Sequence, residues 1–327
     1  IGRNRFTLEM SDSILGVVFA LIASTSWAAG AVVARVGMKE IGSSTGTLIS
    51  LIAGFPVIAS IALMVDFDAM FKVSSSTILW LALLGFVQFP VGRFLHYNGI
   101  RLAGVGPAAT AGGSTPLLAA IMAIVFLGEQ ITYPTALGTV AVVLGLGLVM
   151  SKAHTSSLAA EPPSTSPRSW LAKTIKSHGV RVSLVTGILS SLAGATAYAL
   201  GHNIARHVLT STTSAPVTAS YTLFFGMAIL TIISIPKLGE LLIAPRSGIL
   251  MMAASGVLSS LAIFFMYTAL SKAPVTVASP VVALYPLIAM TLTHVFFQRL
   301  ERITAGMVVG AIMVAIGVIF VIVGNPT

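Results

Sequence analysis

Two copies of one apolar segment make up this chain, and this duplication limits its possible folds more than any other feature. Residues 93–132 align with residues 263–304 at an offset of 170 as far as Pro116, and at 172 beyond it. Upstream the copies align at 171. The matched pairs include Gly16 with Gly187, Trp27 with Tyr198, Gly30 with Gly201, Arg35 with Arg206, Tyr97 with Tyr267, Glu129 with Glu301, Gly138 with Gly310 and Gly145 with Gly317. Internal repeats of this kind are typical of secondary transporters.

The composition indicates that the surrounding solvent is a lipid bilayer. The chain is 56% hydrophobic and 8% charged, whereas a soluble domain carries about 25% charged residues. Segments of roughly 20 apolar residues can cross a membrane as helices. Ten segments qualify, at residues 13–36, 45–65, 77–101, 105–127, 132–151, 182–206, 215–236, 247–270, 275–297 and 303–324. The net charge of +9 therefore belongs to membrane topology, and we expect no nucleic-acid partner.

The arrangement of the segments predicts an inverted repeat. Residues 1–151 hold five spans, the Pro/Ser-rich and basic residues 152–181 form a linker, and residues 182–327 hold five more. The basic stretch 170–178 could form a short interfacial helix. Because five is odd, the second copy enters the membrane from the opposite side. We therefore predict an all-α membrane protein of ten transmembrane helices in two inverted five-helix repeats, with a substrate site near the midplane.

Polar side chains gather on one face of the span at 77–101. At helical spacing along this face lie Phe89, Arg93, His96 and Tyr97. A charge at the bilayer centre costs from about 3 to over 10 kcal/mol, so this face is expected to line a cavity, with Arg93, His96 and Tyr97 in contact with substrate. The alternative is that Arg93 neutralises helix ends or snorkels to the surface. Its position eight residues before the end of the predicted span opposes snorkelling.

The span at 182–206 repeats this pattern with Tyr198, His202 and Arg206 at i, i+4 and i+8. We expect Tyr198 and His202 to contact substrate, with His202 or His96 as a carrier of a coupled proton. A purely structural histidine is the alternative. Arg206 and its counterpart Arg35 lie at predicted helix ends, where a cation either complements the helix dipole or acts as a gate.

Prolines mark two further spans that we expect to face each other across the pathway. Pro116 and Pro286 are matched by the repeat, and Pro280 lies one turn and a half before Pro286. Proline bends a membrane helix and frees a carbonyl group, which is tolerated beside a cavity; kinked packing without function is the alternative. Tyr267 and Tyr285 lie too deep for an interfacial belt, so we place both at the cavity wall.

The absence of acidic residues from the middle of every span favours an anionic or zwitterionic solute. A guanidinium group matches carboxylates and phosphates in a fork geometry, and the sequence does not separate the two. Nucleophile elbows, phosphate loops, paired carboxylates and His-x-x-x-His pairs are missing, and the chain has no cysteine. We therefore expect no catalytic residues, no metal site and no cofactor; a membrane-embedded enzyme is a remote alternative.

The duplicated Pro–x–Glu pattern resembles the drug/metabolite transporter superfamily, EamA type. It runs from Pro116-Leu117-Leu118 to Gly128-Glu129-Gln130, and in the second copy from Pro286-Leu287-Ile288 to Leu300-Glu301-Arg302, where the turn is longer. The resemblance covers nearly the whole chain outside 152–181. It implies a central cavity enclosed by helices 1–4 and 6–9, with helices 5 and 10 outside. We expect the protein to reside in the cell (inner) membrane of a prokaryote.

These observations together predict a secondary active transporter of a small anionic or zwitterionic metabolite, such as an amino acid or organic acid, working by alternating access. The alternative is a flippase for an isoprenyl-phosphate lipid carrier. Protons are the candidate coupling ion. The Gly306–Gly310 spacing leaves a monomer or a homodimer open, because such a motif packs helices either within or between chains.

Overall fold

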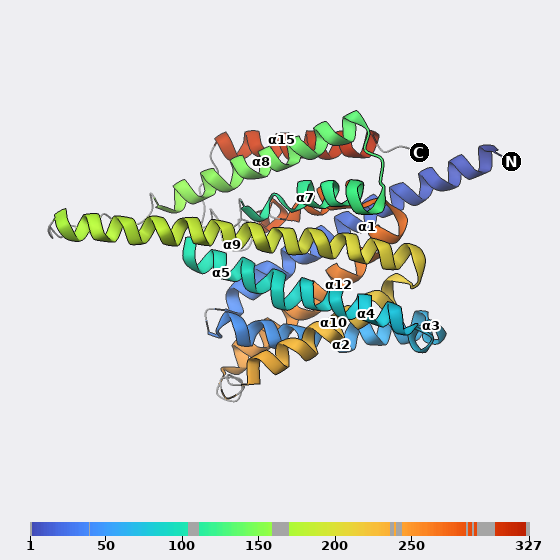
Figure 1. Cartoon of the computed structure of the whole chain (residues 1–327), viewed down its shortest axis with the longest axis horizontal. Coiled ribbons are helices and arrows are strands. Elements are labelled where there is room, and N and C mark those ends of the chain that lie inside the picture. The colour runs from blue at the N-terminus through green and yellow to red at the C-terminus, as the bar shows by residue number, and fades with distance from the viewer. Residues whose placement is uncertain are drawn as a thin grey trace.

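The computed structural model describes residues 2–38, 40–103, 111–158, 170–235, 239, 244–285, 287–289, 291–292 and 305–324. Its regular elements are helices (Figure 1). The first copy contains α1 (Gly2–Gly37), α2 (Ser43–Val65), α3 (Phe67–Phe71), α4 (Ser75–Phe86), η1 (Val87–Arg93), α5 (Phe94–Ala103), α7 (Thr115–Met122), η2 (Ala123–Leu127) and α8 (Tyr133–Leu158). The second contains α9 (Trp170–Ser211), α10 (Ala215–Ser234), α12 (Arg246–Lys272), α13 (Val275–Val282) and α15 (Ala305–Val323).

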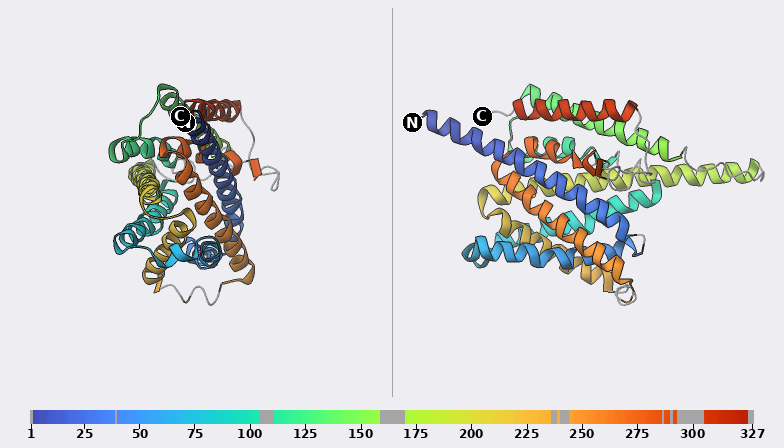
Figure 2. Two further views of the ribbon diagram at one scale, coloured as in Figure 1. Left: turned by 90° about the vertical axis from the view of Figure 1, so that its right-hand side faces the viewer. Right: turned by 180° about the vertical axis from the view of Figure 1, so that it is seen from behind.

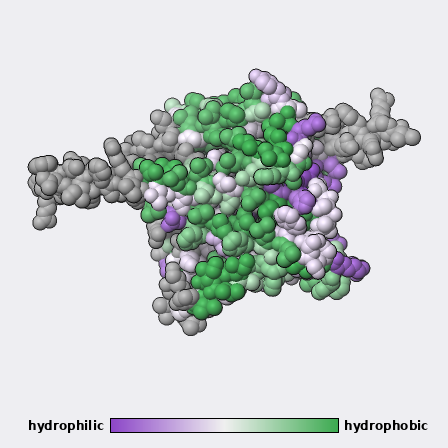
Figure 3. Space-filling view, in the orientation of Figure 1, coloured by the Kyte–Doolittle hydropathy of each residue, from purple (hydrophilic) through white to green (hydrophobic). Residues whose placement is uncertain are grey.

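The predicted membrane spans are confirmed as helices. Six described helices are long and apolar enough to cross a bilayer, and four shorter apolar helices coincide with the remaining predicted spans. Large apolar side chains are exposed along them, including Met64, Leu79 and Phe126. Figure 3 shows the resulting apolar surface across the middle of the molecule, with polar residues gathered toward one end. Such a surface is unfavourable in water and suits contact with lipid.

Helices α8 and α15, the last of each copy, pack against each other in the antiparallel sense expected of an inverted repeat. They lie side by side at one edge of the bundle (Figures 1 and 2). A methyl group on Gly145 would lie 2.7 Å from the carbonyl oxygen of Gly310, and one on Gly310 would lie 2.7 Å from that of Gly145. Gly138 and Gly317 approach each other in the same way. Since 138 pairs with 317 and 145 with 310, the helices are antiparallel, and the contacts interchange under the repeat.

This packing also bears on the Gly306–Gly310 motif. Within the described part of the chain, Gly310 lies against α8 of the same molecule. Small residues allow such a close backbone approach, which is how membrane helices gain dispersion energy without a hydrophobic driving force. The motif thus serves packing inside one chain at Gly310, and the oligomeric state stays open.

The bundle has two ends, which we call the termini face and the linker face. The termini face carries the start of α1, the end of α15, α3 and the turns at 128–132, 212–214 and 273–274. The linker face is the opposite end, where α1 ends, α2 begins, and α8 and α9 project from the bundle (Figure 1). Figure 2 shows both chain ends together at the termini face.

Two helices differ from the sequence expectation. Helix α9 runs without interruption from Trp170 to Ser211, so the basic stretch expected as a separate interfacial helix continues into the membrane span. No proline occurs between Pro167 and Pro216 to end it. The third spanning helix is not regular. It joins α4, η1 and α5, and η1 is a π-helix containing Pro90. We refer to this composite, residues 75–103, as the third helix.

Candidate functional site

A cavity of about 330 Å³ lies between the two copies. Its volume falls in the range of small-molecule sites. The residues that line it come from the linker-face half or the middle of their helices, so the cavity extends from the midplane toward the linker face. The principal polar and aromatic lining residues are Trp27, Thr47, Ser50, Gln88, Phe89, Arg93, His96, Thr115, Tyr198, His202, Ser255, Ser259, Ser279 and Tyr285.

The third helix and α9 bring the basic and aromatic side chains together at one corner. The guanidinium carbon of Arg93 lies 5.2 Å from the ring centroid of Phe89, within the range of a cation–π contact. The rings of His96 and Tyr198 meet edge to face at 6.3 Å. Gly92 permits this approach, because a methyl group there would lie 2.9 Å from the Tyr198 ring.

His202 lies deeper in the same wall, 6% exposed. Its Nδ1 is 3.3 Å from the hydroxyl of Ser279 on α13, and which atom donates depends on the histidine tautomer. Next to it, Gln88 packs against α9 at Gly201. The side-chain oxygen of Gln88 is buried and has no hydrogen-bond partner among the described residues. A buried acceptor in this state is costly, and here the oxygen faces the backbone of α9 at Gly201.

The opposite wall, from α1, α2 and α12, is lined by hydroxyl groups and apolar side chains. The Ser255 hydroxyl donates to the Gly30 carbonyl at 2.8 Å, and the Ser50 hydroxyl donates to the Thr47 carbonyl at 2.7 Å. Both oxygens still have lone pairs to offer. Among the described lining residues Arg93 is the single formal charge, and none is a carboxylate.

Two helices that contribute to the cavity are broken at equivalent positions. The fourth span is interrupted by a turn at Gly113–Ser114, and α13 ends at a turn over Ala283–Leu284, 170 residues further on. Pro116 follows the first break, in the opening turn of α7, and lines the cavity. Pro280 lies inside α13. Discontinuous helices in matching positions of two repeats are a recurrent feature of transporter substrate sites.

The termini face is closed by polar contacts between the copies. The two carboxylate oxygens of Glu129 accept hydrogen bonds from the backbone N–H groups of Val275 and Thr276, at 2.9 and 3.0 Å. Glu129 thereby caps the N-terminus of α13 with a negative charge, where the helix dipole favours one. Arg206 lies 3.9 Å from Glu129 and donates to the carbonyl of Leu270.

Arg206 therefore does not complement the end of its own helix, since α9 continues to Ser211. It donates to the carbonyl group of Leu270 in the last turn of α12 and lies near Glu129. Arg206 thus connects α9 with α12 and with the turn at 128–132. We call Glu129, Arg206 and their backbone partners the latch. A second, exposed pair joins Lys272 to Asp12 at 2.9 Å.

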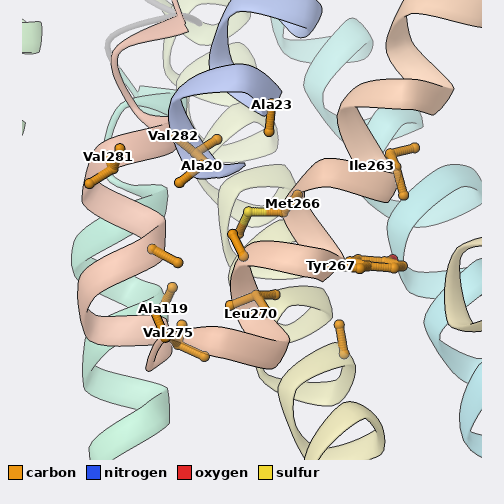
Figure 4. Close-up of a cluster of buried hydrophobic side chains, with 14 of the residues drawn as sticks. Ala20, Ala23, Ala119, Ile263, Met266, Tyr267, Leu270, Val275, Val281 and Val282 are labelled. Carbon is orange, nitrogen blue, oxygen red and sulfur yellow. The ribbon is translucent and has the colours of Figure 1, made fainter. Parts of the chain in front are cut away.

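An apolar layer separates the cavity from the latch. It consists of side chains with no exposed area and is shown with its neighbours in Figure 4: Ala20, Ala23, Ala119, Met266, Leu270 and Val275. We call this layer the plug. From the cavity residue Ile263 to Leu270 at the latch, α12 advances roughly 10 Å at 1.5 Å per residue. The termini face is thus closed while the cavity lies on the linker side.

The structure brings together most of the predicted site residues. The cavity wall contains Arg93, His96, Tyr198, His202, Tyr285 and Pro116. Tyr267 does not line it; its side chain is 1% exposed and lies within the apolar core (Figure 4). The side chains of Arg35 and Tyr97, and residue Pro286, lie outside the described part. The sequence interpretation missed Gln88, Ser255 and Ser259, for which the only signal was a polar residue inside an apolar span.

The described residues form six long and four shorter apolar helices in two copies around a polar cavity, an arrangement typical of polytopic membrane transport proteins. A family model identifies the group within this class. The EamA-like transporter family matches residues 14–151 and 185–323, which together form most of the chain, so this protein belongs to that family.

One curated protein and one solved structure are similar to this chain. An uncharacterized transporter from Clostridium kluyveri (strain ATCC 8527 / DSM 555 / NBRC 12016 / NCIMB 10680 / K1) is 24% identical over 135 residues, which is 41% of this chain and 43% of that protein. The aligned region thus spans less than half of the relative. A crystal structure described only as that of a protein superposes with a TM-score of 0.70 at 14% identity, covering 93% of this chain and 95% of the other. At this identity the likeness shows the fold alone.

Proposed function

We propose that this protein is a secondary active transporter of a small anionic or zwitterionic metabolite and works by alternating access. The observation that carries the proposal is the solitary charge of Arg93 in a cavity whose described wall has no carboxylate. Arg93 is only partly exposed, and a cation held away from bulk water is favoured by an anionic partner. An anionic solute supplies that partner, and a carboxylate or phosphate can accept two N–H bonds from the guanidinium fork.

The rest of the wall favours a solute that also carries donors. The hydroxyl oxygens of Ser255 and Ser279 in the cavity wall are acceptors suited to an ammonium or hydroxyl group. An amino acid or hydroxy acid would satisfy both ends of the cavity. Protons are the proposed coupling ion, with His96 and His202 as the candidate carriers, since histidine changes charge near neutral pH.

The closed termini face supports the proposal of alternating access. In the opposite state the plug and the latch would separate, and the linker-face halves of the helices would come together. Inverted repeats can exchange conformations in this way, because each copy can adopt the arrangement of the other. The broken fourth span and α13 provide positions at which the backbone can bend.

The test is uptake into liposomes containing the purified protein. Arg93→Ala is expected to abolish uptake of labelled amino acids and organic acids, while expression and melting temperature stay unchanged. The matched control is Arg246→Ala, which removes an exposed arginine at the start of α12 and should leave uptake intact. Uptake by Arg93→Ala at the wild-type rate would refute the counter-charge role. Movement of labelled isoprenyl phosphate, with no uptake of soluble acids, would establish the flippase function instead.

A further inference from the structure

The two copies differ by one residue at a defined place. The alignment offset is 171 at Gly30 and 170 at Tyr97, so the first copy has one more residue than the second between these positions. An extra residue in a regular α-helix would rotate everything after it by about 100°, since the helix has 3.6 residues per turn. The structure shows where this rotation is avoided.

Packing contacts locate the extra residue. Gly30 lies against Ser259, and the equivalent Gly201 lies against Gln88. Ser259 and Gln88 are 171 apart, so this register holds as far as Gln88. Beyond Gln88, Gly16 lies against the carbonyl group of Ala269. Gly187, the equivalent of Gly16, has its own carbonyl group against Gly99. Ala269 and Gly99 therefore occupy equivalent positions, and they are 170 apart. The register therefore changes between Gln88 and Gly99.

The π-helix η1 occupies this interval, at Val87–Arg93. A π-turn bonds residue i to residue i+5 and so absorbs one residue more than an α-turn. The equivalent helix of the second copy, α12, is an uninterrupted α-helix over Arg246–Lys272. The cavity-lining residues reflect the difference: α12 presents Ser259 and Ile263, four apart, and the third helix presents Gln88 and Arg93, five apart.

The extra residue changes what lies under Arg93. Phe89 corresponds to Ser260, which packs at Gly54 of α2; Phe89 packs in the same way at Gly226 of α10. The Phe89 side chain is 1% exposed, so its ring is held between α10 and the cavity. Arg93 rests on that ring. In α12 the equivalents of Phe89 and Arg93 are Ser260 and Ile263, which are three residues apart. In the third helix Phe89 and Arg93 are four residues apart, and the aromatic ring lies beneath the guanidinium.

We propose that Phe89, seated at Gly226 and separated from Arg93 by the longer turn of η1, is the positioning residue for the cavity guanidinium. This rests on the proposed function of Arg93. Phe89 borders the cavity but is only 1% exposed, so it acts through Arg93 by fixing the direction in which the guanidinium fork points. Ordering a flexible side chain before binding lowers the entropic cost of recognition.

The first experiment measures anion binding by thermal shift and calorimetry, with L-lactate, L-alanine and inorganic phosphate as probes. Phe89→Leu is expected to weaken binding of the anion that the wild type binds roughly tenfold, the scale of a desolvated cation–π contact. Because it also trims a buried ring, it should lower the melting temperature of the free protein equally with and without Arg93. Gly226→Ala, which displaces the ring from α10, should have the same effect. In an Arg93→Ala background, Phe89→Leu should change residual binding by less than twofold. An equal loss in both backgrounds would make Phe89 merely structural.

The second experiment tests the register without any ligand. Deleting Pro90 should convert η1 to an α-turn like that of α12, so the variant should elute as a folded species and melt cooperatively. Deleting Ala262 from α12, which has no turn to give up, should prevent folding. If neither deletion variant folds, the assignment of the extra residue to η1 is overturned. If no probe stabilises the wild type, the proposed function fails, and the deletion pair still decides the register.

Discussion

Removal of the Glu129 carboxylate is expected to open the termini face. The carboxylate accepts two backbone N–H bonds from α13 at 2.9 and 3.0 Å and faces Arg206 at 3.9 Å. Hydrogen bonds to a charged group contribute about 1.5–3 kcal/mol each. Water can replace part of this in the open state, so we expect Glu129→Ala to destabilise the closed state by about 3 kcal/mol, because the two N–H groups then lack their charged acceptor.

A change of about 3 kcal/mol shifts a two-state equilibrium by roughly 10²-fold. Cysteine labelling can measure this shift, because the natural chain contains no cysteine. Ala278 lies one turn inside α13 and has no exposed area. In detergent, Ala278→Cys should react with a polar maleimide slowly, and Glu129→Ala should raise the rate by roughly two orders of magnitude if reaction requires opening.

The control is Asp68→Ala, which removes another acidic residue at the termini face. Asp68 pairs with Lys72 at 3.5 Å, but both side chains are largely exposed, and such pairs contribute little. This variant should leave the labelling rate within twofold of the Ala278→Cys parent. Equal labelling rates with and without Glu129 would show that the latch does not hold the termini face closed.

Three further predictions concern other parts of the bundle. Gly145→Leu should lower the melting temperature in detergent, because overpacking against the Gly310 carbonyl costs about 1–3 kcal/mol; an unchanged melting temperature would contradict the packing of α8 on α15. His202→Gln should abolish the response of liposome uptake to a pH gradient, and a retained response would remove His202 as proton carrier. Asp12→Asn should destabilise the protein by less than about 1 kcal/mol, because its pair with Lys272 is exposed; a larger loss in chemical unfolding would assign this pair a role in closure.

The sequence predicted the fold well because hydropathy and duplication act on whole helices. A run of about 20 apolar residues has few alternatives in a bilayer, and two odd-numbered copies must run in opposite directions. The same reasoning placed Arg93, His96, Tyr198 and His202 at the cavity, which all four line. Each carries a polar group whose exposure to lipid is costly, so a position facing a cavity was expected.

Position within the bundle was harder to predict where a residue has both polar and apolar character. Tyr267 was placed at the cavity wall by its depth, but it lies in the core, because an aromatic ring gains as much from packing as from facing a cavity. Arg206 was interpreted through its own helix, although its partners are Glu129 and Leu270 from other segments. Such contacts depend on tertiary packing and leave no periodic signal in the sequence.

The π-turn of η1 left a trace in the sequence that the sequence analysis did not interpret. The change of offset from 171 to 170 is visible in the alignment of the two copies, and Pro90 lies in the interval. An extra residue in a loop would give the same change, however. The paired contacts of Gly201 with Gln88 and of Gly99 with Gly187 were needed to assign it to the third helix.

The most direct test of an anion site built on Arg93 is equilibrium binding to the purified protein. A carboxylate at 100-fold its dissociation constant should stabilise the wild type by about 2.7 kcal/mol. Arg93→Ala should show no stabilisation at the same concentration, and Arg93→Lys should retain part of it, since lysine keeps the charge without the fork. Equal stabilisation of the wild type and Arg93→Ala would contradict the site.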